Sequence, residues 1–183
     1  DLLEAAGAVI VEGDDPVTLP KAVKNAAELD GTRAAHLRDG AAMVRFLAWL
    51  DREAPKGGLD EVVVAEKLEA IRAETGALRE ISFDTISAAG PHAAIPHYRV
   101  THASSLPLAM DGIFLIDSGA QYEDGTTDIT RTVIVGTATS EMKDRYTRVL
   151  KGMIAISRAR FPKGTTGAHL DVLARQALWS AGL

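Results

Sequence analysis

The stretch FLIDSGAQYEDGTTDITRTVIV, from Phe114 to Val135, holds two apolar or β-branched runs, and each run carries one aspartate. Asp117 follows the first run and Asp128 precedes the second, on either side of a Tyr-Glu-Asp-Gly sequence that is typical of a hairpin turn. A single aspartate at a strand end usually bonds the local backbone. An unpaired carboxylate inside an apolar strand, however, is strongly disfavoured. We therefore interpret Asp117 and Asp128 as candidate ligands of one or two hard divalent cations.

The register of this hairpin decides how far apart the two carboxylates lie. Asp117 lies directly opposite Asp128 only if the hairpin is centred between residues 122 and 123. A two-residue turn at 124–125 places Gln121 opposite Asp128 instead, and Asp117 is then on the order of 13 Å away. The metal hypothesis requires the wider loop, and both registers remain open at this point.

Two helices are predicted ahead of the hairpin. Asn25 and Glu28 have the spacing of a capping box, in which each side chain bonds the backbone N–H of the other residue. The helix that follows repeats apolar residues on one face: Leu37, Ala41, Val44, Leu47 and Ala48, widened by Met43, Phe46 and Leu50. A second helix is predicted from about Asp60 to Gly76, with Val64, Leu68 and Ile71 on its inner face.

Strands and two further helices complete the pattern. Short or extended strands are predicted at residues 6–13, 81–85 and 93–105, and the apolar run at 113–116 predicts a strand covered on both faces. Caps at Thr139 or Ser140 and at Thr166 begin the last two helices. The first of these repeats apolar residues at helical spacing: Met142, Tyr146, Val149, Met153 and Ile156. This order predicts an α+β architecture with helices packed on a mostly antiparallel sheet.

The composition excludes several classes of protein. The 183 residues include no cysteine, so a disulfide framework and a thiolate metal site are ruled out. The net charge of −5 argues against a nucleic-acid partner. No apolar run approaches the roughly 20 residues that a membrane-spanning helix needs, and the first residues are unlike a signal peptide. We expect a cytoplasmic protein, with this chain as a piece of a longer one.

Four segments, in order, resemble the Xaa-Pro aminopeptidase (aminopeptidase P) family of the creatinase/prolidase/methionine aminopeptidase superfamily. They read KNAAELDGTRAAHLRDGAAMVRFLAWL, AAIPHYRVT, LIDSGAQYEDGTTDITRTVIVG and RARFPKGTTGAHLDVLARQALWSAGL. The resemblance implies the pita-bread fold, with residues 20–183 as the first part of the metallopeptidase domain. Residues 1–19 would then be the end of a preceding domain or a linker.

The resemblance also implies a site. Asp117 and Asp128, with ten residues between them, match the first two ligands of a dinuclear centre, usually of manganese, and Asp128 matches the ligand that bridges both ions. His97, followed by Tyr98, matches a catalytic histidine that contacts the substrate near the scissile bond. The substrate would be a peptide with proline in second position, and the full-length protein would be a homodimer. The family's other ligands, one histidine and two glutamates, have no counterpart after Asp128, so we expect this chain alone to be inactive.

Two alternatives stay open within the superfamily. The chain is also compatible with a prolidase-like dipeptidase, although the HYRVT and LARQALW segments favour an aminopeptidase. A non-catalytic pita-bread binding module is the other alternative, and the presence of both aspartates argues against it. The segment before His97 reads GPHAAIP, where the family pattern is similar to GPNGAIV, which leaves the role of His92 open.

Overall fold

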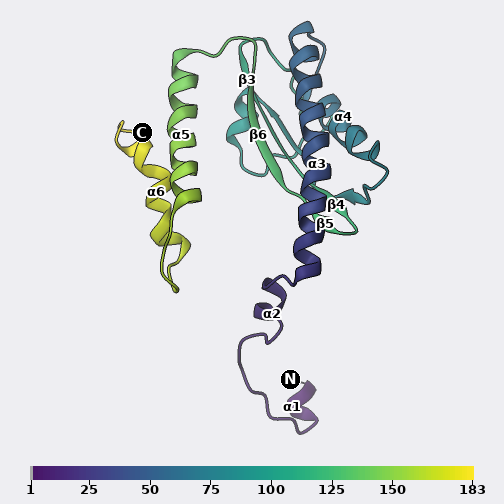
Figure 1. The fold of residues 1–183 in the computed structure, drawn as a ribbon, viewed down its shortest axis with the longest axis vertical. Coiled ribbons are helices and arrows are strands. Elements are labelled where there is room, and N and C mark those ends of the chain that lie inside the picture. Colours follow the sequence, from purple (N-terminus) through teal and green to yellow (C-terminus); the bar gives the residue numbers. More distant parts are fainter. Residues whose placement is uncertain (1) are drawn as a thin grey trace.

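The computed structural model describes residues 2–183. Two three-stranded antiparallel sheets pack beside the long helix α3 and the shorter helix α4, and a hairpin of helices α5 and α6 stands apart on the other side of the sheet (Figure 1). This arrangement confirms the predicted α+β class, with helices packed on antiparallel sheets.

The N-terminal segment lies away from the sheets (Figure 1). It holds two short helices, α1 (Leu2–Ala5) and α2 (Thr18–Ala22). The strand predicted at residues 6–13 is wrong, because this part of the chain has no neighbouring strand to receive its backbone hydrogen bonds. Val9 and Val11 are consequently exposed.

Helix α3 (Ala26–Glu53) begins at the predicted capping box. The Glu28 N–H donates to Asn25 Oδ1 at 2.9 Å, and the Asn25 N–H donates to Glu28 Oε2 at 2.8 Å. A 3₁₀ turn, η1 (Ala54–Lys56), follows the helix.

The inner face of α3 matches the predicted one only in part: Met43, Phe46 and Leu50 are buried as predicted, but most of the other predicted residues are exposed. Leu37 and Val44 are 80% and 67% exposed, and Ala41 and Ala48 are exposed as well. The buried residues of the helix are Ala35, Asp39, Ala42, Met43, Phe46 and Leu50. This face contains an aspartate, so a search for apolar periodicity alone favoured the neighbouring face.

Helix α4 (Glu61–Ala73) confirms its prediction. The Asp60 side chain caps it by accepting from the Val63 N–H at 2.9 Å, and Val64, Leu68 and Ile71 are buried. These side chains form one core with residues from α3 and from the sheet, including Phe46, Phe114 and Ile116.

One sheet has the order β2 (Ile86–Ala89), β3 (Gly112–Ser118), β6 (Ile129–Val135), and the other has β1 (Glu80–Ile81), β4 (Ala120–Tyr122), β5 (Gly125–Thr126). The chain at 82–85 passes from one sheet to the other, so the strand predicted at 81–85 is not continuous. Within the described chain β3 is covered on one face only: Phe114 and Ile116 are buried against the helices, whereas Ile113 and Leu115 are partly exposed. The prediction of cover on both faces is wrong for these residues.

The segment predicted as an extended strand at 93–105 also differs. It begins with a 3₁₀ helix, η2 (Gly90–Ala94), and continues through turns. Pro91 lies at the start of η2, where a missing backbone N–H is tolerated. Pro91 and Pro96 also lack the donors that a sheet strand would need.

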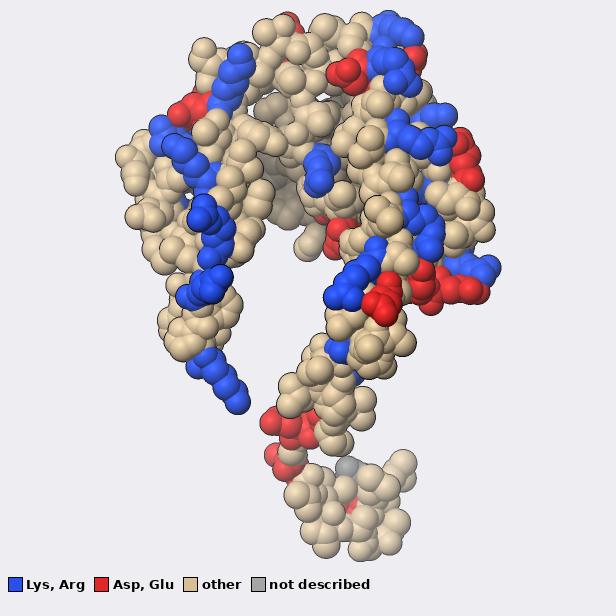
Figure 2. Space-filling model, in the orientation of Figure 1, with Lys and Arg blue, Asp and Glu red and all other residues tan. Residues whose placement is uncertain are grey.

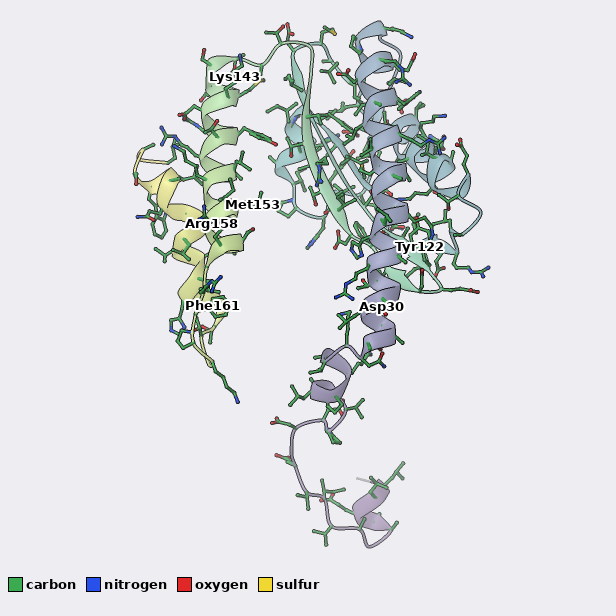
Figure 3. All side chains as sticks on the ribbon, viewed as in Figure 1. Asp30, Tyr122, Lys143, Met153, Arg158 and Phe161 are labelled. Atoms are coloured by element: carbon green, nitrogen blue, oxygen red, sulfur yellow. The ribbon has the colours of Figure 1, made fainter. Side chains whose placement is uncertain are left out.

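Helices α5 (Ser140–Arg158) and α6 (Gly167–Trp179) pack against each other. They cross closely at Gly152, where a Cβ atom would lie 2.1 Å from the Ala174 carbonyl oxygen. The predicted apolar face of α5 is exposed here: Tyr146, Val149 and Met153 are more than half exposed, and Met153 lies on the side of α5 that faces the sheet (Figure 3). No helix within residues 2–183 is long and apolar enough to cross a membrane.

Candidate active site

The two aspartates of the hairpin are diagonal neighbours on one face. Ser118 pairs with Ile129, and Gln121 pairs with Thr126, so one register runs through both sheets. It places Asp128 across from Gly119 and pairs Asp117 with Thr130. The turn lies at residues 123–124, between the two alternatives that the sequence offered. Diagonal neighbours have Cα atoms about 7–8 Å apart, within the reach of two carboxylates on a shared cation.

The two carboxylates influence each other. Burial raises the pKa of Asp128 above its usual range, and the charge of Asp117 and a side-chain hydrogen bond with it raise this pKa further. Asp128 is nevertheless exposed, so the sequence-based view that both aspartates lie in a sheet interior is wrong for Asp128. Asp117 is half-buried, on the face of β3 that α3 and α4 do not cover.

The donor set fits a hard cation in part. The Oδ1 atom of Asp117 is buried and has no hydrogen-bond partner in the described chain, which is unfavourable unless a cation or donor occupies its free side. Carboxylate oxygens are the ligands that Mn²⁺, Mg²⁺ and Ca²⁺ prefer. Within residues 2–183, no group of three or more His, Cys, Asp and Glu side chains forms a metal site. Asp117 and Asp128 are therefore two candidate ligands, fewer than a closed coordination shell needs.

Gly119 brings the two halves of the hairpin together beside these carboxylates. A Cβ atom at this position would lie 2.0 Å from the Thr127 carbonyl oxygen and 2.1 Å from Ser82 Oγ. Only glycine permits this approach, because both distances are shorter than any van der Waals contact. Ser82 Oγ donates to the Thr127 carbonyl at 3.1 Å and joins the preceding segment to the same point.

A buried ion pair anchors the same hairpin to the helices. Arg72 of α4 donates to both oxygens of Asp39 of α3, at 2.8 and 3.0 Å, and both side chains are almost completely buried. The Tyr122 and Thr127 hydroxyls also donate to Asp39, at 2.8 and 3.0 Å. Thr127 directly precedes Asp128, so this network fixes the backbone that carries the exposed aspartate.

The turn of the hairpin rests on α3. Arg38 donates to both carboxylate oxygens of Asp124, at 3.0 and 2.9 Å, and this pairing lowers the pKa of Asp124. Gly31 lies so close that a Cβ atom there would be 2.3 Å from the Asp124 carbonyl oxygen. Figure 3 shows Tyr122 beside α3. Asp124 is thus the turn residue that the sequence predicts, with a tertiary partner that the sequence did not reveal.

His97 lies in a turn directly after η2. Its side chain is exposed and has no hydrogen bond to the described residues. Its backbone has a φ of +59°, in the left-handed region that non-glycine residues rarely adopt. Such strain often accompanies functional sites. The next residue, Tyr98, is buried.

Sequence reasoning missed Glu61, the first residue of α4. Its side chain is fully buried and accepts hydrogen bonds from His92 and Tyr98, on either side of His97. An acidic residue in a first helical turn is ordinary, so this position carried no signal. Asp39 and Arg72 were missed as well. Each is a charged residue at helical spacing from buried apolar residues. This spacing is the sequence feature that could have identified them as buried.

The uncovered face of the sheet opens toward the α5–α6 hairpin. Figure 2 shows open space between that hairpin and the part of the molecule that holds α3 and the sheets. Asp117 projects from the face that α3 and α4 leave free, while the helices hold the opposite face. Asp128 is therefore accessible from this side, whereas Asp117 Oδ1 lies buried beside it.

Comparisons with known proteins agree with this geometry. A model of metallopeptidase family M24 matches residues 30–183. A probable Xaa-Pro aminopeptidase P from Aspergillus clavatus is 52% identical over 176 residues, which cover 95% of this chain and 27% of the fungal protein.

Solved structures show the same relationship. An X-prolyl aminopeptidase from Caenorhabditis elegans, described as a cytosolic enzyme with a di-nuclear active site, has a TM-score of 0.85 and 45% identity, over 92% of this chain and 28% of its own. An X-Pro aminopeptidase from Thermotoga maritima has a TM-score of 0.79 and 28% identity, over 92% and 45%. The chain thus has the pita-bread fold in part, and spans little more than a quarter of the curated relatives it matches.

Proposed function

This chain belongs to metallopeptidase family M24, and from that premise we propose that residues 20–183 are the first part of the catalytic domain of an Xaa-Pro aminopeptidase. Residues 1–19 would be a linker or the end of a preceding domain. The observation that carries the proposal is the carboxylate pair of Asp117 and Asp128, with one buried oxygen of Asp117 lacking a partner. The identity of about half to fungal proteins named as probable Xaa-Pro aminopeptidases P supports it.

The proposed roles of the aspartates follow from their positions. Asp128 is exposed and lies between β5 and β6, so its carboxylate would be the one available to both cations. Asp117 is half-buried and would bind one. The remaining ligands would lie outside these 183 residues. When bound, a metal pair supplies an activated water molecule and charge stabilisation for peptide hydrolysis.

The proposed role of His97 is a hydrogen bond to the scissile carbonyl oxygen and to the oxyanion that develops from it. Support comes from its exposure, from the absence of a side-chain partner in the described chain and from its strained backbone. A donor aimed at a developing oxyanion typically contributes a factor of about 10²–10³ to kcat.

Several finer properties belong to the same proposal. We propose manganese as the metal, peptides with proline in second position as substrates, and a cytoplasmic homodimer as the full-length state. Elemental analysis of the purified full-length protein, light scattering and cell fractionation test these three points in turn.

The central experiment measures hydrolysis by the full-length protein with Mn²⁺. A tripeptide of the form Xaa-Pro-Xaa is expected to lose its first residue, while the matched Xaa-Ala-Xaa peptide is not cleaved. Cleavage restricted to Xaa-Pro dipeptides would favour the prolidase-like alternative. The absence of both hydrolysis and bound metal would favour a binding module.

The ligand assignment is tested in the same protein. Asp117→Asn and Asp128→Asn are expected to remove bound metal and activity, because an amide offers one neutral oxygen in place of a charged pair. Asp30→Asn is the matched control, since Asp30 is an exposed aspartate of α3 whose side chain forms an ion pair with Arg33 and lies far from the hairpin in sequence. Full metal content in Asp128→Asn would refute the assignment.

A further inference from the structure

Glu61 is a fully buried carboxylate with four hydrogen-bond donors around it. Oε1 accepts from the Ala89 N–H at 2.7 Å and from His92 Nδ1 at 2.8 Å. Oε2 accepts from the Tyr98 hydroxyl at 2.9 Å and from the Leu106 N–H at 3.1 Å. No other side chain in the described part of the chain gathers so many donors from one loop.

The four donors bracket the segment that carries His97. Ala89 is the last residue of β2, and Leu106 lies where the chain returns toward β3. His92 and Tyr98 lie between them, on either side of the turn at His97. One carboxylate thus ties together both ends and the middle of residues 89–106.

The His92 and Tyr98 side chains also contact each other. The rings of His92 and Tyr98 stack with centroids 4.2 Å apart. Burial raises the pKa of Tyr98, so its hydroxyl keeps the proton that it donates to Glu61. Tyr98 also bonds Ser104 Oγ at 3.1 Å. The residue after His97 is therefore held from two directions.

Apart from the Glu61 side chain, the segment is held mainly at its ends. Ala89 pairs with Phe114 of β3, the Glu61 N–H donates to the Leu106 carbonyl at 3.1 Å, and the Val62 N–H donates to Ser105 Oγ at 3.3 Å. Between residues 90 and 104 the backbone hydrogen bonds are short-range, such as those from Ile95 to His92 and from Tyr98 to Ile95, and Arg99 forms an ion pair with Asp84. His97 has a strained φ of +59°, and such a conformation persists only where the surroundings enforce it.

We propose that Glu61 is a positioning residue: it holds the 89–106 segment so that the exposed His97 side chain stays in its strained, substrate-directed position. This inference rests on the proposed function of His97. His92 takes part as a donor to Glu61 and a stacking partner of Tyr98, which assigns it a structural role.

The test uses the full-length protein with Mn²⁺ and an Xaa-Pro-Xaa peptide. Glu61→Gln keeps the shape of the side chain but replaces one carboxylate oxygen by an NH₂ group, which donates. The two hydrogen bonds that this oxygen accepts are therefore lost. We expect kcat to fall by roughly 10–100-fold, since small displacements of catalytic groups have effects of this size, with unchanged metal content. Hydrogen exchange at the Ala89 and Leu106 amides should accelerate.

The control is Val64→Ala, one turn further along α4. Val64 is fully buried in the core and lies outside the Glu61 network, so this variant should lower the melting temperature while kcat stays near wild type. An equal loss of kcat in Val64→Ala would overturn the proposal, because general destabilisation would then explain both variants.

The double variant Glu61→Gln/His97→Ala separates positioning from other effects. If Glu61 acts through His97, the double variant should be no slower than His97→Ala alone. Fully multiplicative losses would overturn the proposal. Should Glu61→Gln fail to fold, Tyr98→Phe removes one of the four bonds with little change in shape, and the same comparison applies.

The outcomes also separate this inference from the proposed function. If the wild-type protein hydrolyses no peptide, the proposed function fails. Hydrogen exchange then remains as the test of whether Glu61 holds the 89–106 segment. Unchanged protection of the Ala89 and Leu106 amides in Glu61→Gln would show that Glu61 does not hold the segment.

Discussion

At the scale of single residues, the carboxylates of Asp117 and Asp128 lie close enough to repel each other when both are charged. Like charges on neighbouring strands are destabilising. Burial, and after it the charge of Asp117, raises the pKa of Asp128. A divalent cation between the two carboxylates would reverse the sign of the interaction. The pair adds nothing to stability without a cation, and this supports the proposed metal site.

His97 and Asp128 should respond differently to substitution in the full-length protein. His97→Ala is expected to retain the fold and the bound metal but to lose kcat and kcat/KM together, by roughly 10²–10³-fold, because an oxyanion donor acts mainly in the transition state. Asp128→Ala should lose the metal itself. Metal analysis and steady-state kinetics on both variants make the comparison. A kcat of His97→Ala near the wild-type value would show that His97 has no role in catalysis.

At the scale of elements, the hairpin β4–β5 and its continuation into β3 and β6 depend on close backbone contact. Gly119 allows the Thr127 carbonyl and Ser82 to approach within distances that no side chain permits. Asp117 and Asp128 lie two residues before Gly119 and directly after Thr127. The geometry of the carboxylate pair thus depends on one glycine.

Gly119→Ala is expected to destabilise the protein by at least about 1–3 kcal/mol, the usual range for overpacking, and to weaken metal binding. The methyl group would meet a backbone carbonyl that cannot move without displacing Asp128. Gly40→Ala is the matched control, since nothing lies within 4 Å of its added Cβ and alanine favours the helix. Denaturant unfolding of both variants measures the difference, and equal stabilities would contradict this account.

The Asp39 network joins α3, α4 and the hairpin through buried charges. Burial and the hydrogen bond to Asp39 raise the pKa of Tyr122 to about 12. The folded protein therefore keeps a phenolic proton that the unfolded chain releases near its ordinary pKa of about 10. The stabilisation from this proton is complete below about pH 10 and is lost as the pH rises toward 12.

Tyr122→Phe removes that titration. The stability difference between the wild type and Tyr122→Phe should be constant up to about pH 10 and should shrink between about pH 10 and 12. Phenolate absorbance gives the direct measurement: the variant should lack one tyrosine that titrates near pH 12. If the tyrosine that the variant has lost is instead one that titrates near pH 10 in the wild type, then Tyr122 is not buried against Asp39.

At the scale of the whole molecule, one face of the sheet and one face of α5 stay open. Asp117 lies on the uncovered sheet face, and Tyr146, Val149 and Met153 form an exposed apolar stripe on α5. The chain spans 27% of its fungal relative and 28% of the C. elegans enzyme. We propose that these open faces are completed by further parts of the longer protein.

Residues 1–183 by themselves are expected to bind Mn²⁺ weakly and to have no peptidase activity. Two carboxylates supply too few donors for a closed dinuclear site, and the described residues offer no cluster of three or more ligands. Calorimetry with Mn²⁺ and a peptide assay make the test. Tight binding of two ions would mean that a ligand in this chain was overlooked.

The sequence by itself determined the features that depend on neighbouring residues. The capping box at Asn25, the start of α4 near Asp60, a cap at one of Thr139 and Ser140, the inner face of α4 and the hairpin between two strands were all predicted correctly. Each rests on hydrogen bonds or side-chain spacings within about four residues, which the order of residues specifies directly. The resemblance to the aminopeptidase family was likewise carried by contiguous segments.

Only the tertiary structure decided the features that depend on distant residues. The hairpin register follows from the packing of its turn on α3, through an Arg38–Asp124 pair separated by 86 positions. The buried face of α3 follows from the partner of Asp39, which is Arg72 on another helix. Glu61 acquires its role from donors 28 to 45 positions away. Burial and partner choice are set by the folded surroundings, so a local pattern cannot specify them.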